Sequence, residues 1–70
     1  MQILLRNLKT AQYFQTPDKW TADQMEARDF ETLNQAIAFA RQNHLAGVEI
    51  VLAFDDPHRD IHFPLQDHSL

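Results

Sequence analysis

Hydrophobic and polar residues alternate over several short stretches of the chain, and this pattern predicts β-strands. The strongest signal is residues 48–54, where apolar side chains occupy every second position and therefore one face of a strand. Residues 3–6 and 12–15 are predicted to pair as a hairpin around a turn at residues 7–10. Residues 59–63 are predicted to form a last short strand whose two apolar side chains face inward.

Residues 33–43 are predicted to form the helix of the chain. Thr32 and Gln35 have the spacing of a capping box, in which the Thr32 hydroxyl accepts from the amide of Gln35 and the Gln35 side chain reaches back to Thr32. Asn43 or His44 is expected to end the helix in the left-handed conformation. The apolar stripe that would pack on a sheet consists of Leu33, Ala36, Ile37 and Ala40.

These elements give an α+β fold of two layers, in which one helix packs on one face of a small, mostly antiparallel sheet. The sheet is expected to have three or four strands in a ββαβ(β) arrangement. A second capping-box spacing at residues 21–24 predicts one further helical turn. We expect residues 1–65 to form a single domain and residues 66–70 to form a loose tail. The predicted core contains Ile3 or Leu4, Leu5, Tyr13 or Phe14, Trp20, Phe30, Leu33, Ile37, Ala40, Ile50, Leu52 and Phe54.

Several groups of residues resemble a set of short bacterial proteins of uncharacterised function. These groups are Lys9-Thr10-x-x-Tyr13, Trp20, Ala27-x-Asp29-Phe30-x-Thr32-x-x-x-Ala36 and Gly47-Val48-Glu49-Ile50-Val51-Leu52. The resemblance covers residues 3–54 and implies the ββαβ arrangement, but it implies no activity, cofactor or catalytic residue. The chain departs from the pattern at Ala11, where the resemblance predicts glycine after Lys-Thr.

The charge balance argues against a nucleic acid or a membrane surface as a partner. The 70 residues include 6 basic and 10 acidic ones, for a net charge of −4. Binding to phosphates or to anionic lipids needs a basic patch, whereas the basic residues here are scattered singly: Arg6, Lys9, Lys19, Arg28, Arg41 and Arg59. The sequence has no cysteine and its first residues lack the pattern of a signal peptide, so we expect a cytoplasmic protein. A DNA-binding module of sheet plus helix is the weakest alternative.

A dense group of polar residues near the end of the chain contains the candidate metal ligands. In an extended segment, His58, Asp60 and His62 share one face and could present two imidazoles and a carboxylate to Zn²⁺ or Fe²⁺. We favour the alternative of a solvated strand face, because this spacing alone is unspecific. Gly47 is the only glycine and Ser69 the only serine, so the sequence has neither a glycine-rich phosphate loop nor a conventional serine triad. We therefore predict no catalytic residue, no cofactor and no metal.

Apolar residues on both faces of the predicted sheet leave a surface that one helix cannot cover. Leu4, Val51 and Ala53 lie on the face opposite the core side chains, and we interpret them as an interaction surface. A small chain without disulfides also gains stability from a second subunit. The main hypothesis is therefore a non-catalytic protein-interaction module that forms a homodimer or binds an unknown protein, and a metal-binding domain is its alternative.

Two further interpretations concern how the apolar surface is closed. In a monomer, residues 57–65 could fold back over the Leu4 face, with Ile61, Phe63 and Leu65 as the cover. Trp20 is interpreted as a lid over the open end of the core, with an exposed anchor for a partner as the alternative.

Overall fold

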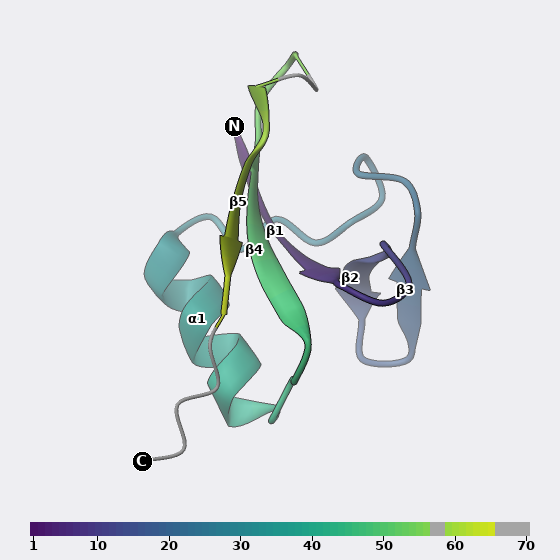
Figure 1. Cartoon of the computed structure of the whole chain (residues 1–70), viewed down its shortest axis with the longest axis vertical. Helices are drawn as coiled ribbons and strands as arrows, with labels where there is room; N and C mark the ends of the chain where they lie inside the picture. Colours follow the sequence, from purple (N-terminus) through teal and green to yellow (C-terminus); the bar gives the residue numbers. More distant parts are fainter. Residues whose placement is uncertain (57–58, 66–70) are drawn as a thin grey trace.

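The computed structural model describes residues 1–56 and 59–65 of the chain. In this part of the chain, one helix packs against a five-stranded antiparallel sheet with the order β3-β2-β1-β4-β5 (Figure 1). The predicted α+β class is confirmed, with five strands in place of three or four. The elements are β1 (Gln2–Asn7), β2 (Tyr13–Thr16), β3 (Lys19–Thr21), α1 (Leu33–Gln42), β4 (Val48–Ala53) and β5 (Ile61–Pro64).

The long central pair of strands, β1 and β4, fixes which side chains face the helix. Leu5 lies opposite Ile50 and Leu4 lies opposite Val51 in the antiparallel register. Because successive side chains of a strand point to opposite faces, the first pair faces α1 and the second pair faces away from it. Both pairs are buried, so the sheet has an apolar core on each of its two faces.

The helix begins where the capping signal predicts. Thr32 is the N-cap residue, and its Oγ1 accepts from the Gln35 amide at 3.1 Å. The second half of the capping box does not form, because the Thr32 N–H donates to the Phe30 carbonyl at 2.7 Å instead. The helix ends one residue earlier than predicted, with Asn43 as the C-cap.

The residue after the C-cap, His44, has a φ of 52° and lies in the left-handed region. Its N–H donates to the Arg41 carbonyl, and the Leu45 N–H donates to the Ala40 carbonyl. This pair of bonds is a Schellman motif, which satisfies carbonyls that the end of the helix leaves without partners.

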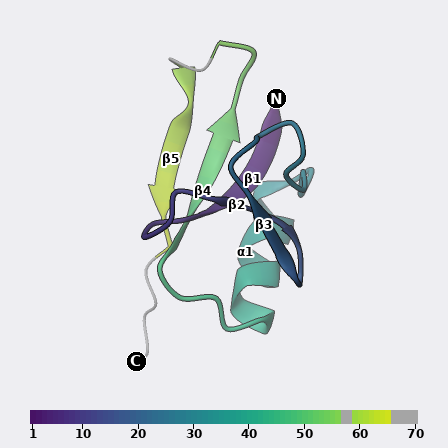
Figure 2. The same ribbon diagram turned by 90° about the vertical axis from the view of Figure 1, so that its right-hand side faces the viewer.

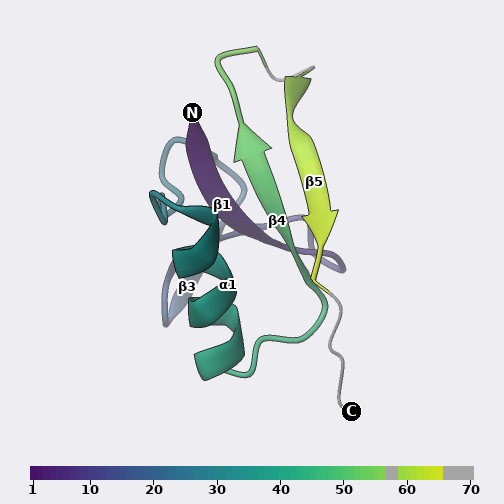
Figure 3. The same cartoon turned by 90° about the vertical axis from the view of Figure 1, so that its left-hand side faces the viewer.

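The helix lies over β1 and β4, and β5 stands beyond it at the edge of the sheet (Figure 3). Between α1 and β2, Phe39 packs against Phe14 with ring centroids 4.9 Å apart and against Phe30 at 5.1 Å. The buried residues of this helix-side core are Ile3, Leu5, Phe14, Phe30, Ala36, Ala40, Val48 and Ile50.

The hairpin of β2 and β3 lies at a steep angle to β4 and β5 (Figure 2). The turn between β1 and β2 is stabilised by Asn7, whose Oδ1 accepts from the N–H groups of Lys9 and Thr10. Ala11 has a φ of 62° in this turn, a conformation that favours glycine. The backbone at this position therefore has a conformation that suits the glycine expected there.

Two sequence-based expectations for this region and the core were wrong, and one strand was missed. The β3 strand was not predicted. The helical turn expected at residues 21–24 does not form: Thr21 ends β3, and the residues after it form a bend and a turn, in which the Thr21 side chain accepts from the Asp23 amide and Asp23 accepts from the Met25 amide. Leu33 and Phe54, two of the predicted core residues, are exposed.

Candidate interaction surface

The residues predicted as an interaction surface are buried within the chain itself. Leu4, Val51 and Ala53 are 0%, 0% and 3% exposed. Ala27 and Tyr13 pack against them on the face of the sheet that α1 leaves free. Because this second core leaves no apolar surface at the three residues, they do not form the exposed patch that the sequence suggested.

Ala27, which covers part of this face, belongs to residues 22–31, the segment that connects β3 to α1 and runs beside the edges of β1 and β2. The Arg28 N–H donates to the Phe14 carbonyl at 3.0 Å, and the Phe30 N–H donates to the Ile3 carbonyl at 2.9 Å. Asp29 Oδ1 accepts from the Ile3 N–H at 3.1 Å. The segment is thus fixed to the backbone of β1 and β2, and residues 59–65 do not provide this cover.

An exposed apolar strip lies instead on the helix side of β5. Ile61 and Phe63 pair with Leu52 and Ile50 of β4 and point to the same face as these residues. They are 44% and 43% exposed, because α1 covers β1 and β4 but ends short of β5. The prediction that these two side chains face inward is therefore only half right: they face the helix side but remain open to solvent.

Further apolar side chains, from α1 and β4, lie on the same side of the sheet as Ile61 and Phe63. Leu33 and Ile37 are one helical turn apart on α1, on the flank opposite Phe39. Leu52 and Ile37 are half-buried in the helix-side core, whereas Leu33 is exposed. We call Leu33, Ile37, Leu52, Ile61 and Phe63 the β5 strip.

The outer edge of β5 carries backbone groups that no strand pairs within residues 1–56 and 59–65. The Leu65 N–H donates to the Val48 carbonyl at 3.3 Å. Because inward and outward backbone groups alternate along an antiparallel strand, Ile61 and Phe63 also direct theirs toward β4, whereas His62 and Pro64 direct theirs outward. Pro64 has no N–H, so of these two residues only His62 offers a donor to a further strand.

A charged group that the sequence analysis missed lies on the far face beside this edge. Glu49 Oε2 accepts from Arg6 Nη1 at 2.8 Å and lies 2.8 Å from His62 Nδ1. The Glu49 side chain is 7% exposed, so the carboxylate is buried between its two partners. A lone acidic residue inside an otherwise apolar strand was the signal for this cluster, since a buried charge requires a partner.

The candidate metal ligands have other partners where the structure describes them. His58 lies outside the described residues. Asp60 accepts from Gln24 Nε2 at 2.9 Å and from the Phe54 N–H at 3.3 Å, and His62 is bonded to Glu49. Within residues 1–56 and 59–65, no three His, Asp or Glu side chains gather as metal ligands.

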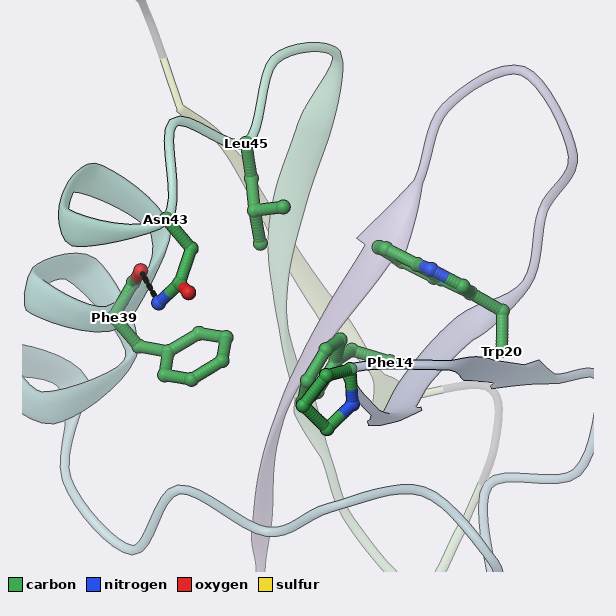
Figure 4. A pocket seen from close by; sticks show the side chains of 6 residues that line it. Phe14, Trp20, Phe39, Asn43 and Leu45 are labelled. Atoms are coloured by element: carbon green, nitrogen blue, oxygen red, sulfur yellow. Dashed lines mark hydrogen bonds between the residues drawn. The ribbon is translucent and has the colours of Figure 1, made fainter.

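Trp20 lies at the opposite edge of the sheet, beside a pocket of about 200 Å³. Its ring packs edge-on against Phe14 at a centroid distance of 5.6 Å. Figure 4 shows Trp20 on one side of the pocket and Phe39, Asn43 and Leu45 on the other. The Asn43 side-chain amide donates to the Phe39 carbonyl, so its N–H₂ group is partly used within the helix end. Trp20 is half-buried and packs over one end of the core, in agreement with the lid interpretation.

No helix among the described residues is both long and apolar enough to cross a membrane. Comparison with protein-family models, with curated proteins and with solved structures gives no match for the chain.

Proposed function

We propose that the chain is a non-catalytic protein-interaction module that works in the cytoplasm and binds its partner through the β5 strip. The observation that carries this proposal is the placement of Ile61 and Phe63 on an edge strand, exposed and facing the helix side. Large apolar side chains gathered at one place on a small protein mark a contact surface more often than isolated ones do.

The charges of the chain support a protein as the partner. The Glu49 carboxylate is bonded to Arg6 and His62, so these two groups are not free to bind a phosphate, and the net charge of the chain is −4. The phosphates of nucleic acids and anionic lipids require unpaired basic groups in a cluster. An apolar strip beside free backbone groups is instead the arrangement with which proteins bind a further strand.

A photo-reactive side chain at the strip tests the proposal. Phe63 is replaced by p-benzoylphenylalanine, and the protein is irradiated in the cells that produce it. The matched control carries the same group at Met25, which is 82% exposed but lies outside the strip. We expect one discrete product from position 63 that mass spectrometry identifies as a single protein, and none from position 25.

A second substitution decides whether that product depends on the strip. Ile61→Asp in the chain that carries the photo-reactive group should remove the product, because the charge disrupts the apolar contact. Equal products from positions 63 and 25, or a product that survives Ile61→Asp in a folded chain, would contradict the proposal.

A further inference from the structure

We propose that the partner is a second copy of this chain, and that the two copies join by antiparallel pairing of β5 with β5 about a two-fold axis at His62. This inference rests on the proposed function of the β5 strip and specifies its partner. The result would be a continuous sheet across two subunits, with β5 of each copy no longer at an edge.

The backbone of β5 favours a two-fold axis centred at His62. His62 directs both its N–H and its carbonyl outward, so a two-fold axis at this residue lets each copy donate to the other. A centre at Pro64 would lack both donors, because proline has no N–H. A centre at Phe63 would place each outward N–H of His62 opposite Pro64 and form only half of the bonds of each pair.

The side chains select the same register. With His62 opposite His62, Ile61 of each copy lies opposite Phe63 of the second copy, on the helix side. The two β5 strips then join into one apolar surface that crosses the interface. A shift of the axis to Ile61 would place Phe63 opposite Arg59 and leave the aromatic ring without an apolar neighbour.

The other face of the interface is compatible with this pairing. The two His62 side chains meet there, and each remains bonded to the Glu49 carboxylate of its own chain at 2.8 Å. The β3 strand, at the opposite edge of the sheet, is less suited to pair with a second copy. It has only three residues and includes Lys19, a residue type that discourages edge pairing.

The absence of cysteine from the natural sequence makes the register directly measurable. Single cysteines are introduced at Arg59, Ile61, His62 and Phe63, and at Met25 as a control, and each variant is oxidised at micromolar concentration. Only a residue on the axis faces itself, at a Cα separation of about 5.5 Å that suits a disulfide. We expect His62→Cys to form covalent dimers about tenfold faster than any other variant. A maximum at position 61 or 63, or equal rates at all positions, would overturn the register.

A backbone modification distinguishes a dimer held by hydrogen bonds between the two β5 strands from a dimer held only by contact between the two β5 strips. It leaves the His62 side chain in place. Chemical synthesis gives the chain with Nα-methylhistidine at position 62, in which a methyl group replaces the hydrogen of the backbone N–H. Circular dichroism verifies its fold. Sedimentation equilibrium should show that the unmodified chain approaches twice its mass of 8.2 kDa. The N-methylated chain should dissociate about thirtyfold more readily, because two interchain hydrogen bonds are lost.

The possible failures are distinguishable from one another. A dimer that N-methylation leaves unchanged would overturn β5 pairing but keep the strip as a contact. A chain that stays at 8.2 kDa up to several hundred micromolar would overturn the second copy as partner. In that case the product captured at position 63 in cells still decides the proposed function on its own.

Discussion

His62 and Glu49 are bonded diagonally across β4 and β5, with Nδ1 and Oε2 2.8 Å apart. In the register, His62 lies opposite Val51 and Glu49 lies opposite Pro64, so the bond reaches two pairs along the ladder, to the next pair on the same face. Such diagonal contacts are within the reach of long side chains on one face of a sheet. Through Glu49 the edge strand is linked to Arg6 of β1, two strands away in the sheet order β1-β4-β5.

Removal of the Glu49 carboxylate should destabilise the protein markedly. Glu49→Ala deletes the acceptor that both Arg6 and His62 use, and hydrogen bonds to charged groups contribute about 1.5–3 kcal/mol. We expect a loss of about 2 kcal/mol in urea unfolding, and a smaller loss for Glu49→Gln, which keeps the shape of the side chain. Glu26→Ala is the control: Glu26 is exposed and its carboxylate accepts a longer bond of 3.3 Å from the Thr21 hydroxyl, so we expect a smaller loss. Equal effects of Glu49→Ala and Glu26→Ala would show that the buried cluster does not contribute.

The second core should be as sensitive to truncation as the first. Leu4 is 0% exposed beneath Ala27 and Tyr13, so Leu4→Ala leaves a cavity and should cost about 2–5 kcal/mol. Leu8 is half exposed, and Leu8→Ala should cost less than about 1 kcal/mol. Urea midpoints of the two variants measure the difference. If Leu4→Ala were as mild as Leu8→Ala, the face opposite α1 would be open and the sequence-based surface would regain support.

The elements with strong periodic signals were predictable, and their degree of burial was not. The alternation in residues 48–54 and the capping signal at Thr32 locate β4 and α1 to within one residue. Alternation assigns Ile61 to a face but does not show how far a helix extends over that face. The exposure of Ile61 follows from the position of α1 over β1 and β4, which is a property of the assembled sheet.

The cover over Leu4 is a second feature that the sequence pattern did not predict. Residues 22–31 show no regular apolar pattern, and their one buried contact on this face is Ala27, a small residue. What holds the segment is its backbone, through the bonds of Arg28 and Phe30 to β2 and β1. Such bonds involve groups that every residue carries, and therefore the sequence gives no sign of them.

The N-cap of α1 offers a third prediction. Thr32 Oγ1 accepts from the Gln35 N–H, and Thr32→Ala removes this bond from an exposed position. We expect the substitution to cost about 1 kcal/mol in urea unfolding. Asn34→Ala, two residues along the same turn, should stabilise the protein slightly, because alanine has the higher helix propensity and Asn34 is exposed. Effects of the same sign for both substitutions would mean that the helix begins elsewhere.

The turn between β1 and β2 should become more stable when glycine replaces Ala11. At a φ of 62°, the Cβ of alanine crowds the following carbonyl oxygen, at a cost of about 1–2 kcal/mol. Glycine removes this crowding but increases the entropy of the unfolded chain, which offsets up to about 1 kcal/mol of the gain. The surrounding bonds, from the Ala11 N–H to the Asn7 carbonyl and from the Asn7 N–H to the Gln12 carbonyl, use backbone atoms that the substitution leaves in place. We therefore expect Ala11→Gly to stabilise the protein by about 0.5–1 kcal/mol and to raise its melting temperature by about 2–8 °C.

Ala46→Gly is the matched control, because Ala46 is also exposed and outside regular structure but does not have a positive φ. With no crowding to relieve, only the entropic term remains, and the substitution should destabilise the protein by about 0.5–1 kcal/mol. Thermal unfolding followed by circular dichroism measures both variants under one set of conditions. Opposite signs at positions 11 and 46 would separate the conformational effect of glycine from its general cost. A loss of stability at both positions would mean that Ala11 does not adopt the left-handed conformation in solution.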